Sequence, residues 1–152
     1  MLGCLAFIFL QDVKDRKVSL FLLLSGMFLG GALHMSQQNW LFFLFNIGAN
    51  IGVVFFIFII LWGYAKIKLQ KSIFEVFGLG DLLFFLLLSV SLPTLSFLVL
   101  FTASLVFSLL LFLLLKSTFK EKTVPLAGFQ ALFFSLVLVM NEVSHLINIY
   151  AI

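Results

Sequence analysis

Residues 78–95, GLGDLLFFLLLSVSLPTL, open an apolar run that continues without a charged residue from Leu82 to Leu115. As one straight helix, the 34 residues of this run would be about 51 Å long, although a bilayer's hydrocarbon core is only about 30 Å thick. Pro93 disfavours helical backbone at the residue before it, so we predict a break within residues 91–94. The run is therefore expected to form two helices.

The composition excludes a water-soluble domain. Of the 152 residues, 64% are hydrophobic and 10% are charged, and the mean hydropathy is +1.30, whereas about a quarter of the residues of a soluble domain are charged. A single cysteine, Cys4, excludes a disulfide framework, and the isolated His34 and His145 form no metal-ligand pattern. We expect an integral membrane protein in the lipid bilayer, with no metal or other cofactor and, at a net charge of +3, no nucleic-acid partner.

Uncharged runs and basic residues together predict the topology. The five uncharged runs are residues 1–11, 18–35, 39–65, 82–115 and 123–140, and dividing the fourth gives six spans. The nine basic residues form three clusters: Lys14, Arg16 and Lys17; Lys66, Lys68 and Lys71; Lys116, Lys120 and Lys122. All three clusters lie on one side of the membrane only if an even number of helices separates each cluster from the next. The positive-inside rule makes that side cytoplasmic.

The sequence thus predicts one all-α, polytopic domain over residues 1–152, with about six transmembrane helices in the cell inner (plasma) membrane. The first run is short, so its helix either continues past Asp12 or starts upstream of Met1.

Two acidic residues differ from the others in their position. Asp12 and Asp81 each lie where an apolar helix meets a cytoplasmic loop, Asp81 one or two turns into a helix that we expect to begin near Phe74. Intramembrane carboxylates are costly and usually face a polar interior or a partner. Two carboxylates that share a site titrate as a pair, which is the chemistry of aspartic proteases. Gly78 and Gly80 would allow a substrate backbone to approach Asp81 closely.

Simpler interpretations compete with catalysis. A membrane-interface aspartate next to glycines is most often a helix cap or a loop residue. In a transporter or channel, Asp81, Asn46 and Asn50 would line a polar path. The two asparagines are four residues apart, however, and such residues are more often hydrogen-bond partners between helices. Ser104 and Ser108, also four apart, indicate a packing face rather than a nucleophile.

Three segments resemble one known family. Gly78–Asp81 (GLGD) matches the GxGD signature of intramembrane aspartyl proteases. Gln11–Val18 (QDVKDRKV) is similar to the first-aspartate motif of type IV prepilin peptidases and archaeal preflagellin peptidases, in which a basic residue, here Arg16, follows four positions after the aspartate. Val124–Ala131 (VPLAGFQA) resembles the proline-containing segment that opens the last helix of that family.

The resemblance implies a function. These peptidases cut the leader from type IV prepilins, pseudopilins or archaellins at the cytoplasmic membrane face, without a cofactor. By matched position, Asp12 and Asp81 would be the catalytic pair, and Gly78 and Gly80 would shape the site. The chain has one cysteine and thus no paired CxxC motifs, so it resembles the short form without a methyltransferase domain.

Three positions depart from the family pattern. Leu83 stands where a lysine is common, Ser19 where a proline is common, and Ala127-Gly128 where a glycine-proline step is common. A catalytically inactive membrane scaffold of the same fold is therefore the alternative to an active peptidase.

Overall fold

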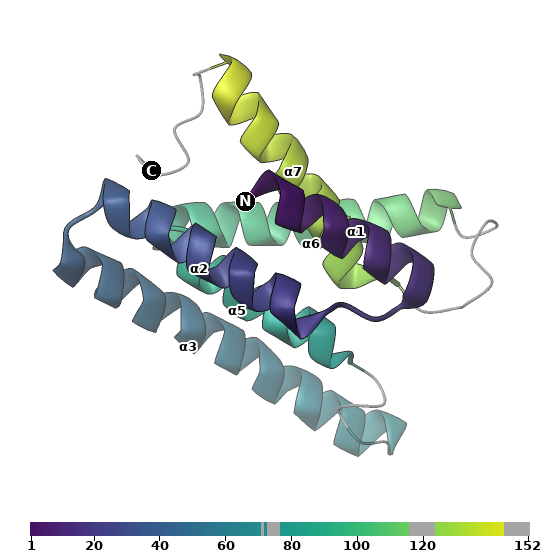
Figure 1. The fold of residues 1–152 in the computed structure, drawn as a ribbon. Helices are drawn as coiled ribbons and strands as arrows, with labels where there is room; N and C mark the ends of the chain where they lie inside the picture. The colour runs from purple at the N-terminus through teal and green to yellow at the C-terminus, as the bar shows by residue number, and fades with distance from the viewer. Residues whose placement is uncertain (71, 73–76, 116–123, 145–152) are drawn as a thin grey trace.

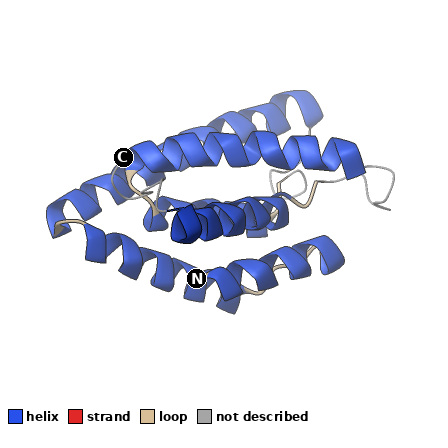
Figure 2. Ribbon diagram, turned by 90° about the horizontal axis from the view of Figure 1, so that it is seen from above, coloured by secondary structure: helices blue, strands red, loops and turns tan. Residues whose placement is uncertain are grey.

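The structure is a computed structural model and describes the chain except residues 71, 73–76, 116–123 and 145–152 (Figure 1). Within the described residues, every regular element is a helix and none is a strand (Figure 2). The elements are α1 (Leu2–Asp15), α2 (Leu20–Gln37), α3 (Trp40–Tyr64), the π-helical turn η1 (Ala65–Leu69), α5 (Leu79–Ser91), α6 (Thr94–Leu115) and α7 (Leu126–Ser144).

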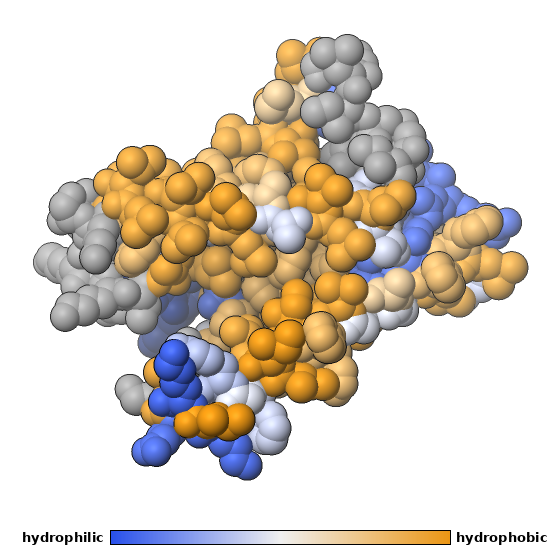
Figure 3. All heavy atoms as spheres, turned by 180° about the vertical axis from the view of Figure 1, so that it is seen from behind, coloured by the Kyte–Doolittle hydropathy of each residue, from blue (hydrophilic) through white to orange (hydrophobic). Residues whose placement is uncertain are grey.

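The protein is an all-α polytopic membrane protein, as predicted. Four helices are long and apolar enough to cross a membrane: α2, α3 with η1, α6, and α7 up to Val143. Apolar side chains cover most of the face in Figure 3, which suits contact with lipid. The other two helices, α1 and α5, have 14 and 13 residues and are therefore only about 20 Å long.

Both predictions about helix ends in these short elements are confirmed. The long apolar run breaks where Pro93 disfavours helix, since α5 ends at Ser91 and α6 begins at Thr94. The first helix continues past Asp12 and ends at Asp15.

Side chains from two neighbouring helices satisfy the carbonyl groups at the end of α5. Asn50 of α3 donates from Nδ2 to the carbonyl oxygens of Ser89, at 2.9 Å, and Leu92, at 2.8 Å. His34 of α2 donates from Nδ1 to the carbonyl oxygen of Val90 at 2.9 Å. The last carbonyls of a helix lack partners within it, and a membrane offers them little water. The fully buried Asn50 and His34 therefore allow α5 to end inside the bundle.

A row of glycines brings α2 against α5. A Cβ atom on Gly26 would lie 2.7 Å from Leu87 Cδ1, and one on Gly31 would lie 2.9 Å from Val90 Cγ1. Gly26 and Gly30 form the small-xxx-small pattern that lets membrane helices approach closely. This pattern is visible in the sequence itself, at residues 26 and 30.

Replacing Asn50 with leucine is expected to lower the free energy of unfolding by about 2 kcal/mol, because two buried carbonyl groups would lose their donor. The measurement is thermal or denaturant unfolding of the purified protein in detergent micelles. Gly48→Ala on the same helix is the control, since nothing lies within 4 Å of a Cβ atom there. Equal stability of Asn50→Leu and wild type would contradict a capping role for Asn50.

Candidate active site

Three helix ends meet at one end of the bundle. They are the last turn of α1, the first turn of α5 and the first turn of α7; α7 crosses α1 and packs mainly against it (Figure 1). The α1–α2 connection and η1 lie at this same end, because α2 leads away from it and α3 returns. The first basic cluster and Lys66 and Lys68 of the second therefore lie at this end of the bundle, whereas Lys71 and the third cluster are outside the described residues.

Two adjacent backbone amides of α7 hold the two aspartates. The Gly128 N–H donates to Asp12 Oδ2 at 2.6 Å, and the Ala127 N–H donates to Asp81 Oδ1 at 2.8 Å. The first amides of a helix have no partner within it, and the helix dipole makes this end attractive to anions. The start of α7 therefore binds both carboxylates and brings together aspartates from distant parts of the chain.

Asp81 lies closer to the start of its helix than predicted. The prediction placed Asp81 one or two turns into a helix from near Phe74; α5 in fact begins at Leu79, and Asp81 is in its first turn. Gly78 has extended backbone, with φ −69° and ψ 139°, and its carbonyl accepts the Asp81 N–H at 3.1 Å. Two glycines so close together disfavour an earlier helical turn, and an acidic residue in the first turn is favoured by the dipole. Phe74 itself lies outside the described residues.

The two glycines before Asp81 have different surroundings. A Cβ atom on Gly78 would lie 3.1 Å from Asp81 Oδ2, so this glycine leaves room beside the carboxylate. A Cβ atom on Gly80 would make only ordinary contact with Val18 Cγ2, at 3.7 Å. Gly78 therefore borders the carboxylate, whereas Gly80 faces the segment between α1 and α2.

Gly128, which the sequence marks only as a departure from the family pattern, is a site residue. A Cβ atom there would lie 3.0 Å from both Cβ and Oδ2 of Asp12, and 3.4 Å from the carbonyl oxygen of Phe9. A proline at this position would have no N–H to donate to Asp12. The hydrogen bond to Asp12 therefore requires a residue other than proline at position 128, and Gly128 meets this requirement. The sequence signal for this role is Pro125, because a proline often marks the start of a helix, where backbone amides are free to bind a carboxylate.

The charges at the site interact with one another. Asp12 is buried, with 7% of its surface exposed, and a negative charge on it disfavours a second negative charge on Asp81. The guanidinium of Arg16 attracts both carboxylates. Arg16, which belongs to the first basic cluster and to the first-aspartate motif in the sequence, lies within electrostatic range of both aspartates.

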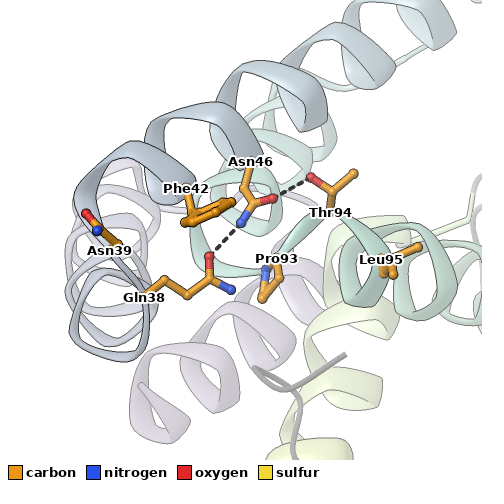
Figure 4. Close-up of a pocket in the computed structure, with 7 residues that line it drawn as sticks. All are labelled: Gln38, Asn39, Phe42, Asn46, Pro93, Thr94 and Leu95. Carbon is orange, nitrogen blue, oxygen red and sulfur yellow. Dashed lines mark hydrogen bonds between the residues drawn. The ribbon is translucent and has the colours of Figure 1, made fainter.

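The two asparagines of α3 lie elsewhere and join helices. Asn46 donates from Nδ2 to Gln38 Oε1 at 2.6 Å, and its Oδ1 accepts from the Thr94 hydroxyl at 2.9 Å (Figure 4). Together with Asn50 on the end of α5, this confirms the prediction of hydrogen bonds between helices. A pocket of about 410 Å³ opens beside Asn46 and Pro93, at the opposite end of α5 from Asp81.

The serines of α6 form part of a packing face, as predicted. Ser104 and Ser108 are buried, and each donates to a carbonyl oxygen one turn earlier in its own helix, Phe101 and Ser104 respectively. Gln130 of α7 donates from Nε2 to Ser104 Oγ at 3.1 Å. These contacts join α6 to α7, the helix whose first turn binds the aspartates.

The site therefore consists of two carboxylates and two backbone amides. In the described part of the chain, no group of three histidine, cysteine or acidic residues is placed to hold a metal ion. A carboxylate pair can act as a general base and a general acid on a water molecule and a carbonyl group. No protein-family model, curated protein or solved structure matches the chain.

Proposed function

We propose that the protein is an intramembrane aspartic endopeptidase that removes the leader peptide of type IV prepilin-like proteins at the cytoplasmic membrane face. The observation that carries the proposal is the pair of hydrogen bonds from Gly128 and Ala127 to Asp12 and Asp81. They bind two carboxylates, from helices far apart in sequence, to neighbouring amides of one helix. The resemblance of the GLGD, QDVKDRKV and VPLAGFQA segments to prepilin peptidases supports the same function.

The chemistry follows from one shared proton. Two nearby carboxyl groups do not both ionise readily, so one is charged and the other is protonated. The charged carboxylate takes a proton from a water molecule, which attacks the scissile carbonyl carbon, and the protonated carboxyl donates its proton to the carbonyl oxygen. The tetrahedral intermediate then breaks its C–N bond as the amine takes up a proton. The α7 amides keep both carboxylates oriented through this cycle.

The short helices supply a route for water. The hydrocarbon core holds almost none, so hydrolysis requires a site near the aqueous edge. Asp12 is in the last turn of α1 and Asp81 in the first turn of α5, at the ends where polar connections begin. The Asp81 side chain is partly exposed. Water can therefore reach the pair from the side of the basic residues.

The basic residues give the orientation of the proposed enzyme. Lys14, Lys17, Lys66 and Lys68 lie at the end of the bundle that holds the aspartates. The positive-inside rule places that end in the cytoplasm, in a multi-pass protein of the inner membrane. A prepilin whose apolar helix lies in the bilayer would present its leader junction at this depth.

The contacts of the asparagines weigh against the transporter interpretation. A polar path would need Asn46 and Asn50 near Asp81, but both bind groups at the α5–α6 corner. That corner lies at the far end of α5 from Asp81. An inactive scaffold would have no need of two carboxylates on one helix end, one of them buried, which is costly in a membrane.

The test is a cleavage assay. The protein is co-expressed with a prepilin from the same genome, and the prepilin is followed by gel shift and mass spectrometry. We expect the wild type to remove the leader just before the apolar segment. A variant carrying both Asp12→Asn and Asp81→Asn should insert in the membrane and leave the prepilin intact. Insertion of the wild type without cleavage of any prepilin of that genome would refute the peptidase function.

A further inference from the structure

The two aspartates belong to two different pairs of packed helices. The helix that carries Asp12, α1, packs mainly against α7, whereas the helix that carries Asp81, α5, packs mainly against α2. The separation of the two carboxylates therefore depends on how the α1–α7 pair lies relative to the α2–α5 pair. At the end of the bundle that holds the site, the chain itself joins the two pairs through the connection between α1 and α2 (Figure 1).

A side chain of α1 binds the start of α2. The N–H of Ser19, the N-cap of α2, donates to Oε1 of Gln11, eight positions earlier in the chain, at 3.0 Å. In a capping box, this N–H is bound by the side chain at the third position of the same helix. That position is Leu22 here, which has no acceptor. Gln11, the residue before Asp12, therefore supplies the acceptor from α1 and joins the two pairs.

The same connection contacts the helix turn of each aspartate. On the α1 side, the N–H of Arg16 donates to the carbonyl oxygen of Asp12 at 3.1 Å. On the α5 side, the partly buried Val18 packs against the core, and a Cβ atom on Gly80 would lie 3.7 Å from its Cγ2. Gly80 directly precedes Asp81. A change in the position of this connection would therefore be felt at both carboxylates.

We propose that Gln11 is a positioning residue whose hydrogen bond to the Ser19 N–H fixes the α1–α7 pair against the α2–α5 pair and thereby sets the separation of the Asp12 and Asp81 carboxylates. Without this bond, the two pairs can move apart at the site end of the bundle. Both carboxyl groups then reach one water molecule and one carbonyl group less often. The inference rests on the proposed peptidase function only for its effect on cleavage.

Two substitutions separate the hydrogen bond from the size of the side chain. Gln11→Met keeps a side chain of similar length but replaces the amide oxygen with a thioether, which is only a weak acceptor. Gln11→Glu keeps Oε1 as an acceptor and adds a charge, so each variant is measured at its own optimal pH. Ser19→Ala is the matched control, because it keeps the N–H and removes only a hydroxyl that makes no capping bond.

The first readout is the steady-state kinetics of prepilin cleavage by equal amounts of monodisperse protein in detergent micelles. Gln11→Met should lower kcat by about 10-fold and leave KM nearly unchanged, because displaced reacting groups slow the chemical step. Gln11→Glu should retain most of the wild-type kcat, and Ser19→Ala should retain all of it. An unchanged kcat in Gln11→Met, or an equal loss in Gln11→Met and Gln11→Glu, would overturn the proposal.

The second readout does not need activity. Spin labels on Lys14→Cys of α1 and Leu79→Cys of α5, both exposed positions, report the separation of the two pairs in a Cys4→Ala background. Adding Gln11→Met should broaden the distance distribution and extend it to longer distances, whereas adding Ser19→Ala should not change it. A distribution that Gln11→Met leaves unchanged would overturn the role of Gln11, even if cleavage is confirmed. A broader distribution without cleavage would support that role and refute only the peptidase function.

Discussion

Replacing Asp81 with asparagine is expected to lower the rate of prepilin cleavage by a factor of about 10³ or more, because an amide can neither take a proton from water nor donate one as a carboxyl does. Asp12→Asn should have an effect of the same order. Asparagine has nearly the same shape as aspartate, and its Oδ1 can still accept the N–H of Ala127 or Gly128. The fold and the first turn of α7 should therefore survive either change.

The double substitution separates a catalytic pair from two independent contributions. Residues that act as one unit have strongly non-additive effects, so the Asp12→Asn, Asp81→Asn double variant should be about as slow as either single variant. The measurement is the initial cleavage rate at equal amounts of membrane-inserted protein. Glu142→Gln is the matched control, since this exposed carboxylate lies on α7 far from its first turn. Wild-type cleavage by either single variant would rule out the paired mechanism.

Gly128→Val is expected to reduce cleavage by about 10²-fold, through geometry rather than through charge. A Cβ atom at this position would already lie 3.0 Å from Cβ and Oδ2 of Asp12, and valine adds two methyl groups. Either α1 must move away from α7 or the Asp12 carboxylate must leave the Gly128 amide. Both outcomes displace one carboxylate from its neighbour.

The control for Gly128→Val is Gly48→Val on α3, where nothing lies within 4 Å of a Cβ atom. It should cleave at the wild-type rate, which would show that an added β-branched side chain in a membrane helix is not itself harmful. Gly128→Ala should have an intermediate effect, because its single methyl group requires a smaller shift. Equal cleavage by wild type and Gly128→Val would mean that the Gly128–Asp12 contact does not position the carboxylate.

The sequence alone determined the class and the order of the helices. Its hydropathy requires lipid around the chain, its charged residues are confined to short segments, and Pro93 divides the longest apolar run. Each of these signals acts over one helix length or less, so it can be read without knowing the neighbours of a residue. The choice of Asp12 and Asp81 came from the same kind of signal, since each is a charge at the end of an apolar run.

Only the tertiary structure decided which groups meet at the site. The sequence has no local mark that the amides of Ala127 and Gly128 bind carboxylates from α5 and α1, because those bonds join residues 46 and 116 positions apart. The capping of α5 by Asn50 is equally non-local, joining residues 39 and 42 positions apart. Side chains and free backbone groups at helix ends must find partners where water is scarce. The packing of α1 and α5 against α7 determines which partners they find.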